Sequence, residues 1–285
     1  MKKIRWCATS FRNDFLAEIK DVQLAPLDAG LEAEVMKVDV EGARFVLKIW
    51  NKGSKPDVWF QYCLLQTLNE SGIAVSKSYG YGYDEAGNAV LLTSFDGVPI
   101  EDDVEGALVK LAEILAKIHA FPVASCKDFS LPRYDFIDYF YPQHERFSDL
   151  NRVLEQLVNS AKIKQTSLIH GDFHLNNVLE KDGRFTVIDW TNGQLGDPRY
   201  DLAWAYVLIR IYFGKKQQAV FLSEYKKHLS FPLETLERFE ALACLRWLLL
   251  DRIADMPKQE DTYAQVKQLL QANRYLSLNL LELND

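Results

Sequence analysis

A short polar stretch between apolar runs, from Ser167 to Trp190, is the feature that most restricts how this chain folds. Its sequence, SLIHGDFHLNNVLEKDGRFTVIDW, contains two histidines, two asparagines and three aspartates. The apolar runs beside these residues are typical of buried strands. Polar groups buried beside strands need hydrogen-bond partners or a bound ion. The stretch is therefore either a turn held together by its own side chains or a binding site.

The N-terminal third of the chain has the pattern of a sheet. Residues 21–50 alternate apolar and polar side chains, which predicts paired strands with turns at residues 28–30 and 40–42. Residues 57–70 have apolar side chains at helical spacing and end before a glycine. Two more strands are predicted around a turn at residues 85–88. We expect a mostly antiparallel sheet with one helix packed on it.

The pattern changes to helical spacing after Asp96-Gly97. Residues 104–120 place Leu108, Leu111 and Leu115 on one helical face. Further helices are predicted near residues 147–161, 200–213, 217–228, 233–254 and 260–281. The sequence therefore predicts an α+β fold with two domains, an N-terminal sheet lobe at residues 1–95 and a C-terminal, mainly helical lobe at residues 96–285 that contains the polar stretch.

Charge and composition argue against several classes of protein. The formal net charge is −7 and the basic residues form no run, so neither nucleic acid nor an anionic membrane is an expected partner. No apolar run is long enough for a membrane span, and the N-terminus lacks the apolar segment of a signal peptide. Four cysteines are widely spaced and form no CxxC pair. We expect a cytoplasmic protein with reduced thiols.

Three interpretations of the polar stretch are open from its residues alone. Asparagine and aspartate between strands often cap turns by bonding nearby backbone groups. His170, Asp172 and His174 alternate, so on a straight strand they would share a face and could bind zinc or iron. However, Gly171 and the Leu-Asn-Asn that follows indicate a loop.

The third interpretation is phosphoryl transfer. Asp172 is followed five residues later by Asn177, and Asp189 ends the apolar strand at residues 185–188. An acid that orients a hydroxyl, with an amide and a carboxylate that hold Mg²⁺, is the set of groups that a kinase loop supplies. Magnesium prefers oxygen ligands and keeps several waters, so two protein groups are enough.

Three motifs in this order resemble one family. HGDFHLNNVL, then VIDW, then GDPRYDLAW are similar to the motifs of the aminoglycoside phosphotransferase and choline kinase family. The resemblance implies a bilobal protein-kinase-like fold. It also implies a Mg²⁺-dependent enzyme that transfers the γ-phosphoryl group of ATP or GTP to a hydroxyl of a small acceptor, which is aminoglycoside-, choline- or sugar-like. The oligomeric state cannot be read from the motifs.

The resemblance also implies roles for single residues. Asp172 would accept or orient the proton of the acceptor hydroxyl, and Asn177 and Asp189 would bind the metal. Lys48, in the strand RFVLKIW, would contact the α- and β-phosphates. The connector Thr93-Ser94-Phe95 would contact adenine through its backbone. The three oxygen-bearing side chains are expected to converge around the metal and the triphosphate.

Three further residues would support these groups. The resemblance implies that His170 orients the loop and that Asp201 braces it from the following helix. The helix at residues 57–70 should carry a glutamate that pairs with Lys48, but counting back from the glycine after the helix places Gln61 there. A neutral amide can donate or accept a hydrogen bond but cannot form the ion pair. The predicted phosphate-covering loop, residues 27–34, contains one glycine.

Two other functions compete with a small-molecule kinase. A catalytically idle kinase-like protein that binds a nucleotide or partner is favoured by Gln61 and opposed by the intact trio of Asp172, Asn177 and Asp189. A kinase for protein side chains is opposed by the short segment between Asp189 and the following helix, which leaves no room for a long activation segment.

The acceptor itself is not specified by the motifs. Acidic and aromatic residues of the helical part could hold a cationic acceptor, or could equally be solvated and core residues. The candidates are Asp135, Asp138, Asp251, Asp255, Glu260, Trp247, Tyr139 and Tyr141.

Overall fold

The computed structural model describes residues 4–10, 23–27, 33–40, 42–50, 56–100, 104–229, 231–254 and 256–281. The predicted turn at residues 28–30 and most of the predicted phosphate-covering loop lie outside these residues. The chain divides into two compact units, which are described one at a time. The first contains Met1–Pro99, Ala124–Ser130 and Val178–Thr191, and the second contains Ile100–Val123, Leu131–Asn177 and Asn192–Asp285. The predicted domain boundary after residue 95 stays a prediction.

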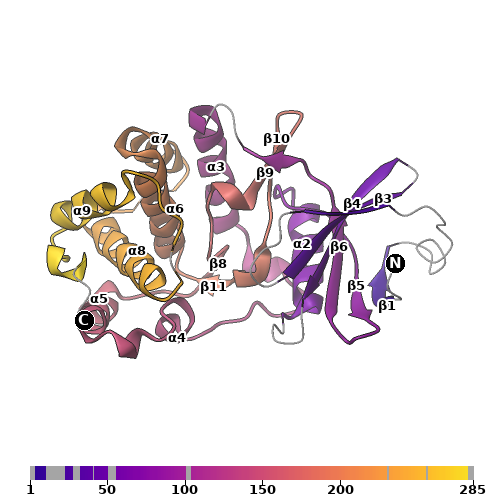
Figure 1. Ribbon diagram of the computed structural model, residues 1–285, viewed down its shortest axis with the longest axis horizontal. Coiled ribbons are helices and arrows are strands. Elements are labelled where there is room, and N and C mark those ends of the chain that lie inside the picture. Colours follow the sequence, from indigo (N-terminus) through magenta and orange to yellow (C-terminus); the bar gives the residue numbers. More distant parts are fainter. Residues whose placement is uncertain are drawn as a thin grey trace. The chain divides into compact units, whose positions relative to one another are not determined.

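The described residues of the first unit contain a six-stranded sheet whose strands all pair antiparallel (Figure 1). Its order is β1-β5-β6-β4-β3-β2. The prediction of a mostly antiparallel sheet is confirmed. The strands are β1 (Ile4–Thr9), β2 (Gln23–Pro26), β3 (Ala33–Val40), β4 (Ala43–Trp50), β5 (Ser78–Asp84) and β6 (Ala89–Ser94). Strand β1, at one edge, was not predicted. Helix α2 (Val58–Glu70) packs against β5 and β6, as predicted for the helix at residues 57–70.

The alternating sequence pattern explains which face of the sheet is buried. Val38 on β3, Leu47 on β4 and Leu92 on β6 belong to one apolar cluster and are 1–3% exposed. Side chains alternate along a strand, so Lys48, the neighbour of Leu47, lies on the opposite face of β4. Because of this alternation, the one lysine of β4 lies outside the apolar cluster.

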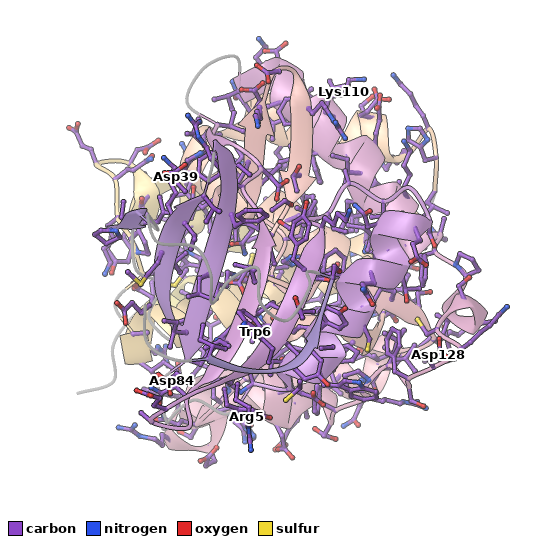
Figure 2. All side chains as sticks on the ribbon, turned by 90° about the vertical axis from the view of Figure 1, so that its right-hand side faces the viewer. Arg5, Trp6, Asp39, Asp84, Lys110 and Asp128 are labelled. Atoms are coloured by element: carbon purple, nitrogen blue, oxygen red, sulfur yellow. The ribbon has the colours of Figure 1, made fainter. Side chains whose placement is uncertain are left out.

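Side-chain hydrogen bonds fix the start of α2 and the turn between β5 and β6 where the sequence predicts them. Asp57 caps α2 by accepting a hydrogen bond from the backbone N–H of Phe60 at 2.9 Å. Asp84 closes the predicted turn between β5 and β6 by accepting from the backbone and the side chain of Asn88 at 2.8 and 2.9 Å. Figure 2 shows Arg5 and Asp84 close together at this end of the sheet, where β1 pairs with β5.

A second, three-stranded sheet joins the polar stretch to the first unit. Its order is β10-β9-β7, with β7 (Val98–Pro99), β9 (Val178–Lys181) and β10 (Arg184–Val187) all antiparallel. Gly97 precedes β7 with φ +115°, and a Cβ there would lie 1.9 Å from the carbonyl oxygen of Glu180. Only glycine fits so close to the neighbouring backbone. The backbone N–H of Val187 also donates to Ala74 at 2.8 Å, so the end of β10 belongs to the N-terminal unit.

The second unit is mainly helical, as predicted. Its helices are α3 (Val104–His119), α4 (Phe136–Phe140), α5 (Ser148–Ala161), α6 (Pro198–Phe213), α7 (Lys215–Tyr225), α8 (Leu233–Ala254) and α9 (Thr262–Ala272). A two-stranded sheet of β8 (Ser167–Ile169) and β11 (Gln194–Gly196) lies beside them. Helix α4 and strands β7 and β11 were not predicted, and each has five residues or fewer, which is too short for a periodic pattern.

The core of the second unit is built on α6 and α8, which pack on each other. Trp204 on α6 and Trp247 on α8 are 2% and 0% exposed. The predicted helix at residues 260–281 is wrong in its second half, because α9 ends at Ala272 and a separate 3₁₀ turn follows at Leu278–Leu281. Among the residues that the structure describes, no helix is both long and apolar enough to cross a membrane.

A half-buried ion pair ties α5 to α8. Arg252 donates to both carboxylate oxygens of Asp149, at 2.9 and 2.7 Å, and also to the carbonyl oxygen of Leu280 at 2.8 Å. The hydrogen bond from Arg252 lowers the pKa of Asp149 below its ordinary value. A carboxylate whose pKa is lower in the folded state stabilises the fold above its unfolded pKa, and this stabilisation is lost as the pH falls through the folded pKa.

We expect Asp149→Asn to lower the free energy of unfolding at neutral pH by about 2 kcal/mol, because a charge-assisted hydrogen-bond pair is lost. The difference between parent and variant should shrink as the pH is lowered from neutral towards the pKa of the folded carboxyl. Urea denaturation at several pH values measures both quantities. A difference that stayed constant over the acid range would contradict this account.

Candidate functional site

The loop that follows β8 is held by one buried carboxylate. Asp201, on the first turns of α6, is 0% exposed. Its Oδ2 accepts the backbone N–H of His170 and its Oδ1 accepts the backbone N–H of Gly171, both at 2.9 Å. Gly171 has φ +80°, and a Cβ there would lie 2.8 Å from the carbonyl oxygen of Asn192. The loop therefore needs both a glycine and a carboxylate from the next helix.

Two residues that the sequence analysis missed complete this anchor. His119, at the end of α3, places Nε2 at 3.1 Å from Asp201 Oδ2 and Nδ1 at 2.6 Å from the hydroxyl of Tyr225 on α7. A neutral His119 that accepts from Tyr225 and donates to Asp201 satisfies all three groups. Burial raises the pKa of Asp201, but the bonds from His119 and from the loop outweigh it and the net shift is downward. Asp201 is therefore held as a carboxylate.

Asp172 is surrounded by donors. The indole N–H of Trp204 donates to its Oδ1 at 2.8 Å. The Nη2 of Arg246 lies 3.7 Å from Oδ1 and the Nε2 of His174 lies 3.5 Å from Oδ2. Burial raises the pKa of Asp172, but His174, the charge of Arg246 and the Trp204 hydrogen bond more than compensate. Their combined effect holds the pKa of Asp172 well below its usual range.

Asn177 is oriented by the same loop. Its Nδ2 donates to the carbonyl oxygen of Asp172 at 2.9 Å and lies 3.1 Å from Nε2 of His174. In this orientation the amide oxygen receives no hydrogen bond from any residue that the structure describes. Asn177 is 9% exposed, whereas its neighbour Asn176 is exposed. An oxygen ligand for a cation is therefore available at Asn177.

The histidines do not form a metal site with Asp172. His170 is 0% exposed, and its Nδ1 accepts the backbone N–H of Asp172 at 3.3 Å. Over the described part of the chain, no group of three or more His, Cys, Asp or Glu side chains is placed to hold a metal ion. The geometry assigns His170 to the loop itself.

Lys48 and Asp189 meet in the first unit. Lys48 Nζ lies 3.7 Å from Asp189 Oδ1, and the hydroxyl of Thr191 donates to the same oxygen at 2.8 Å. Asp189 follows β10 with φ +61°, in the left-handed region. A non-glycine residue in this region costs about 1–3 kcal/mol and such residues cluster at functional sites. Asp172 and Asn177 belong to the second unit, so only Lys48 and Asp189 among the predicted residues are joined here.

Gln61 occupies a buried position on α2, where it is 4% exposed. Among the described residues, no hydrogen bond joins Gln61 to Lys48, and the ion pair of Lys48 is the one with Asp189. Lys48 is thus paired with Asp189 and has no carboxylate partner at position 61.

The predicted adenine-binding connector is partly engaged within the sheet. Thr93 pairs with Val46 and Ser78 in the strand ladder. The backbone N–H of Ser94 donates to Lys77 at 2.9 Å, and that of Phe95 donates to Arg44 at 3.4 Å. A nucleotide base would therefore meet carbonyl groups of this segment more readily than these two N–H groups.

Two of the predicted acceptor-binding aromatics belong to the core. Tyr141 and Trp247 are each 0% exposed. The hydroxyl of Tyr141 donates to the carbonyl oxygen of Leu242 at 2.8 Å, and Trp247 donates to the hydroxyl of Tyr212 at 3.2 Å. Of the two roles that the sequence left open for Tyr141 and Trp247, the structure therefore supports the core role.

Two other acceptor candidates, Tyr139 and Asp135, are not buried. Tyr139 stacks on Tyr134 at 4.6 Å between ring centroids and donates to Asn192, the residue against Gly171, at 2.8 Å. Asp135 caps α4, and Asp255 lies outside the described residues.

The sequence profile of the APH family, described as the phosphotransferase enzyme family, matches residues 23–248. The chain belongs to this family. The match covers both β4 with Lys48 and the segment from Asp172 to Asp201, so the residues described above lie within it. The protein is a phosphotransferase.

Solved structures of phosphotransferases have the same fold. A thermostable mutant of the aminoglycoside phosphotransferase APH(4)-Ia, in ternary complex with ADP and hygromycin B, has a TM-score of 0.67 and 19% identity, covering 94% of this chain and 99% of that one. Amicoumacin kinase hAmiN, in complex with AMP-PNP, Ca²⁺ and Ami, has a TM-score of 0.64 and 17% identity, covering 91% of each chain.

A third similar structure is the choline kinase LicA from Streptococcus pneumoniae. It has a TM-score of 0.60 and 18% identity, covering 90% of this chain and 95% of that one. No curated protein matches the sequence. The predicted bilobal protein-kinase-like fold is confirmed by these similarities.

We expect Tyr225→Phe to lower the free energy of unfolding by about 1–3 kcal/mol, because it leaves Nδ1 of the buried His119 without its donor. Tyr263→Phe is the matched control, since that hydroxyl donates to Asp251 from a residue that is 50% exposed. Chemical denaturation of both variants measures the difference. Equal losses in the two variants would show that the His119 anchor contributes nothing specific.

Proposed function

We propose that this phosphotransferase moves the γ-phosphoryl group of ATP to a hydroxyl of a small acceptor, with Mg²⁺. The observation that carries the proposal is the loop of Asp172 and Asn177. It holds one ionised carboxylate at a fixed position and one amide oxygen that no described residue occupies. Phosphoryl transfer needs little covalent chemistry from the protein and depends on positioning and charge neutralisation, which is what such a loop supplies.

Asp172 is assigned to the acceptor hydroxyl. Its Oδ1 accepts a hydrogen bond from Trp204 at 2.8 Å, while the nearest donor to Oδ2 among the described residues, Nε2 of His174, lies 3.5 Å away. Oδ2 is therefore the oxygen that accepts the hydrogen bond of the acceptor hydroxyl. This hydrogen bond orients the hydroxyl oxygen toward the γ-phosphorus atom. As the new P–O bond forms and the bond to the leaving ADP breaks, Oδ2 takes the proton of the hydroxyl.

Asn177 and Asp189 are assigned to the metal. Both offer oxygen atoms, the ligand type that Mg²⁺ prefers, and a magnesium ion keeps waters in its remaining positions. The bond from Nδ2 of Asn177 to the Asp172 carbonyl at 2.9 Å leaves the amide oxygen for the ion. When bound, the ion would neutralise charge on the phosphate oxygens. Lys48, which pairs with Asp189, is assigned to the α- and β-phosphates.

The acceptor class is a small hydroxyl compound. After Asp189 the chain forms one 3₁₀ turn (Trp190–Asn192) and a three-residue strand before α6 begins at Pro198. This segment is too short to hold an extended peptide. The similar structures include an aminoglycoside phosphotransferase in complex with hygromycin B, an amicoumacin kinase and a choline kinase. They support an aminoglycoside-, choline- or sugar-like acceptor. We place the reaction in the cytoplasm, where the nucleotide is available.

A nucleotide-binding protein without turnover is the second candidate. It is favoured by Gln61, which cannot form an ion pair with Lys48. It is opposed by the Lys48–Asp189 pair, which holds the lysine without that partner, and by the presence of all three oxygen-bearing residues of the trio.

We expect the protein to gain thermal stability with ATP or GTP in the presence of Mg²⁺, since a ligand that binds only the folded state raises the melting temperature. Nucleotide consumption with a panel of aminoglycosides, macrolides, choline, homoserine and sugars identifies the acceptor. A shift with MgATP but no turnover with any acceptor would favour the second candidate, and no shift with either nucleotide would contradict both.

We expect Asp172→Asn to lower kcat by about 10²- to 10⁴-fold and to leave the MgATP-dependent thermal shift in place. Asp189→Ala should instead reduce that shift. The matched control is Asp182→Asn, which changes an exposed aspartate at the turn between β9 and β10, at φ +52°, a conformation that asparagine tolerates. An Asp172→Asn variant that turned over at the parent rate would refute the assigned role.

A further inference from the structure

Arg246, on α8, is a buried cation that the motifs of the sequence do not account for. It is 8% exposed. Its Nη1 donates to the carbonyl oxygen of Gly171 at 2.8 Å, and its Nη2 lies 3.7 Å from Oδ1 of Asp172. Two consecutive residues of the loop are thus contacted by one guanidinium from a helix far along the chain.

The plane of this guanidinium is set by two aromatic rings. Its Cζ lies 4.0 Å from the ring centroid of Trp204 and 4.9 Å from that of Phe140. Arginine stacks on aromatic faces and presents its donors as a rigid fork. Trp204 also donates to Oδ1 of Asp172 at 2.8 Å. Arg246 and Trp204 therefore act on the same oxygen from adjoining positions.

Both contacts leave Oδ2 of Asp172 as the less engaged oxygen. His174 Nε2 lies 3.5 Å from Oδ2, which is longer than an ordinary hydrogen bond. A carboxylate rotates freely unless one oxygen is held, and here Oδ1 accepts a hydrogen bond from Trp204 and also lies 3.7 Å from the charged Nη2 of Arg246. The orientation of the carboxylate is therefore determined by residues of α6 and α8 rather than by the loop alone.

A role in packing alone does not explain this arrangement. Burying an arginine is costly unless its charge is paired and its donors are satisfied, and an apolar side chain would fill the same space between two aromatic rings. The guanidinium is instead directed at the peptide that precedes Asp172 and at the Asp172 carboxylate. Its placement is explained if the position of these two groups matters.

We propose that Arg246 is a positioning residue for phosphoryl transfer. It clamps the Gly171 peptide and, with Trp204, holds Oδ1 of Asp172 so that Oδ2 meets the acceptor hydroxyl. Arg246 acts through Asp172 and does not itself contact the acceptor. The inference rests on the proposed function for the meaning of Oδ2, but the clamp is a property of the protein without ligands.

The test compares Arg246→Met and Arg246→Lys with Arg252→Met. Arg252 lies on the same helix and is equally an ion-paired arginine, but its partners are Asp149 and Leu280 rather than the loop. Four quantities are measured: kcat and KM for ATP with an acceptor that the panel identifies, the MgATP thermal shift, and the NMR resonance of the Trp204 indole N–H, assigned with Trp204→Phe.

We expect Arg246→Met to lower kcat roughly 10- to 100-fold, the effect of misplacing a reacting group by about 1 Å, with KM for ATP and the thermal shift within about twofold of the parent. The Trp204 indole resonance should move, because its acceptor oxygen is released. Arg246→Lys keeps the charge without the fork and should rescue only part of kcat. Arg252→Met should lose stability but keep the parent kcat and the parent indole resonance.

The proposal is overturned if folded Arg246→Met has the parent kcat or an unmoved indole resonance, or if Arg252→Met loses kcat to the same extent. If Arg246→Met does not fold, Arg246→Lys decides, and a parent-like kcat and indole resonance in that variant overturn the proposal. A parent protein that neither binds MgATP nor turns over any acceptor overturns the proposed function, while the indole resonance still decides whether Arg246 holds Asp172.

Discussion

The buried carboxylate of Asp201 is the interaction on which the rest of the site depends. It accepts two consecutive backbone N–H groups of the loop, from His170 and Gly171, and is itself bonded by His119. Unpaired N–H groups at this depth would cost about 1–3 kcal/mol each, so the loop is stable in this conformation only with the carboxylate beneath it. Asp172 is the next residue after Gly171, so the same hydrogen bonds fix the position of its backbone.

The electrostatic environment of Asp172 agrees with a reaction that depends on position more than on basicity. Its carboxylate is accompanied by Trp204 and by the charge of Arg246, and its pKa is held well below the usual range. A carboxylate of this kind is a weak base, but it is fixed and fully ionised. In the first unit, Lys48 on a strand pairs with Asp189, whose backbone is strained and left-handed. The positions of these two side chains are again fixed by the protein itself.

Most of the predicted site residues stand in short-range sequence patterns, whereas Asp201, which contacts a residue 30 positions away, was assigned only from the resemblance. Asp172 and Asn177 are five residues apart on one loop, and Asp189 ends the strand that follows. The alternation of β4 placed Lys48 opposite the apolar cluster for the same local reason. His119, Tyr225, Trp204 and Arg246 could not be found in this way. Each lies in a helix whose periodicity is explained by burial, and a buried polar residue there gives no sign of its distant partner.

The sequence also could not decide whether two aromatic residues of the helical part bind a ligand or belong to the core. Trp247 and Tyr141 looked equally suited to a ligand cage or to a core, and only their burial at 0% exposure decided for the core. The sequence by itself determined the family and the protein-kinase-like fold, because each motif that carries the resemblance is a short, local run of residues. Tertiary structure alone decided that α3, α7 and α8 also support that loop and in which direction the carboxylate of Asp172 points, because those contacts join residues that are 32 to 106 positions apart.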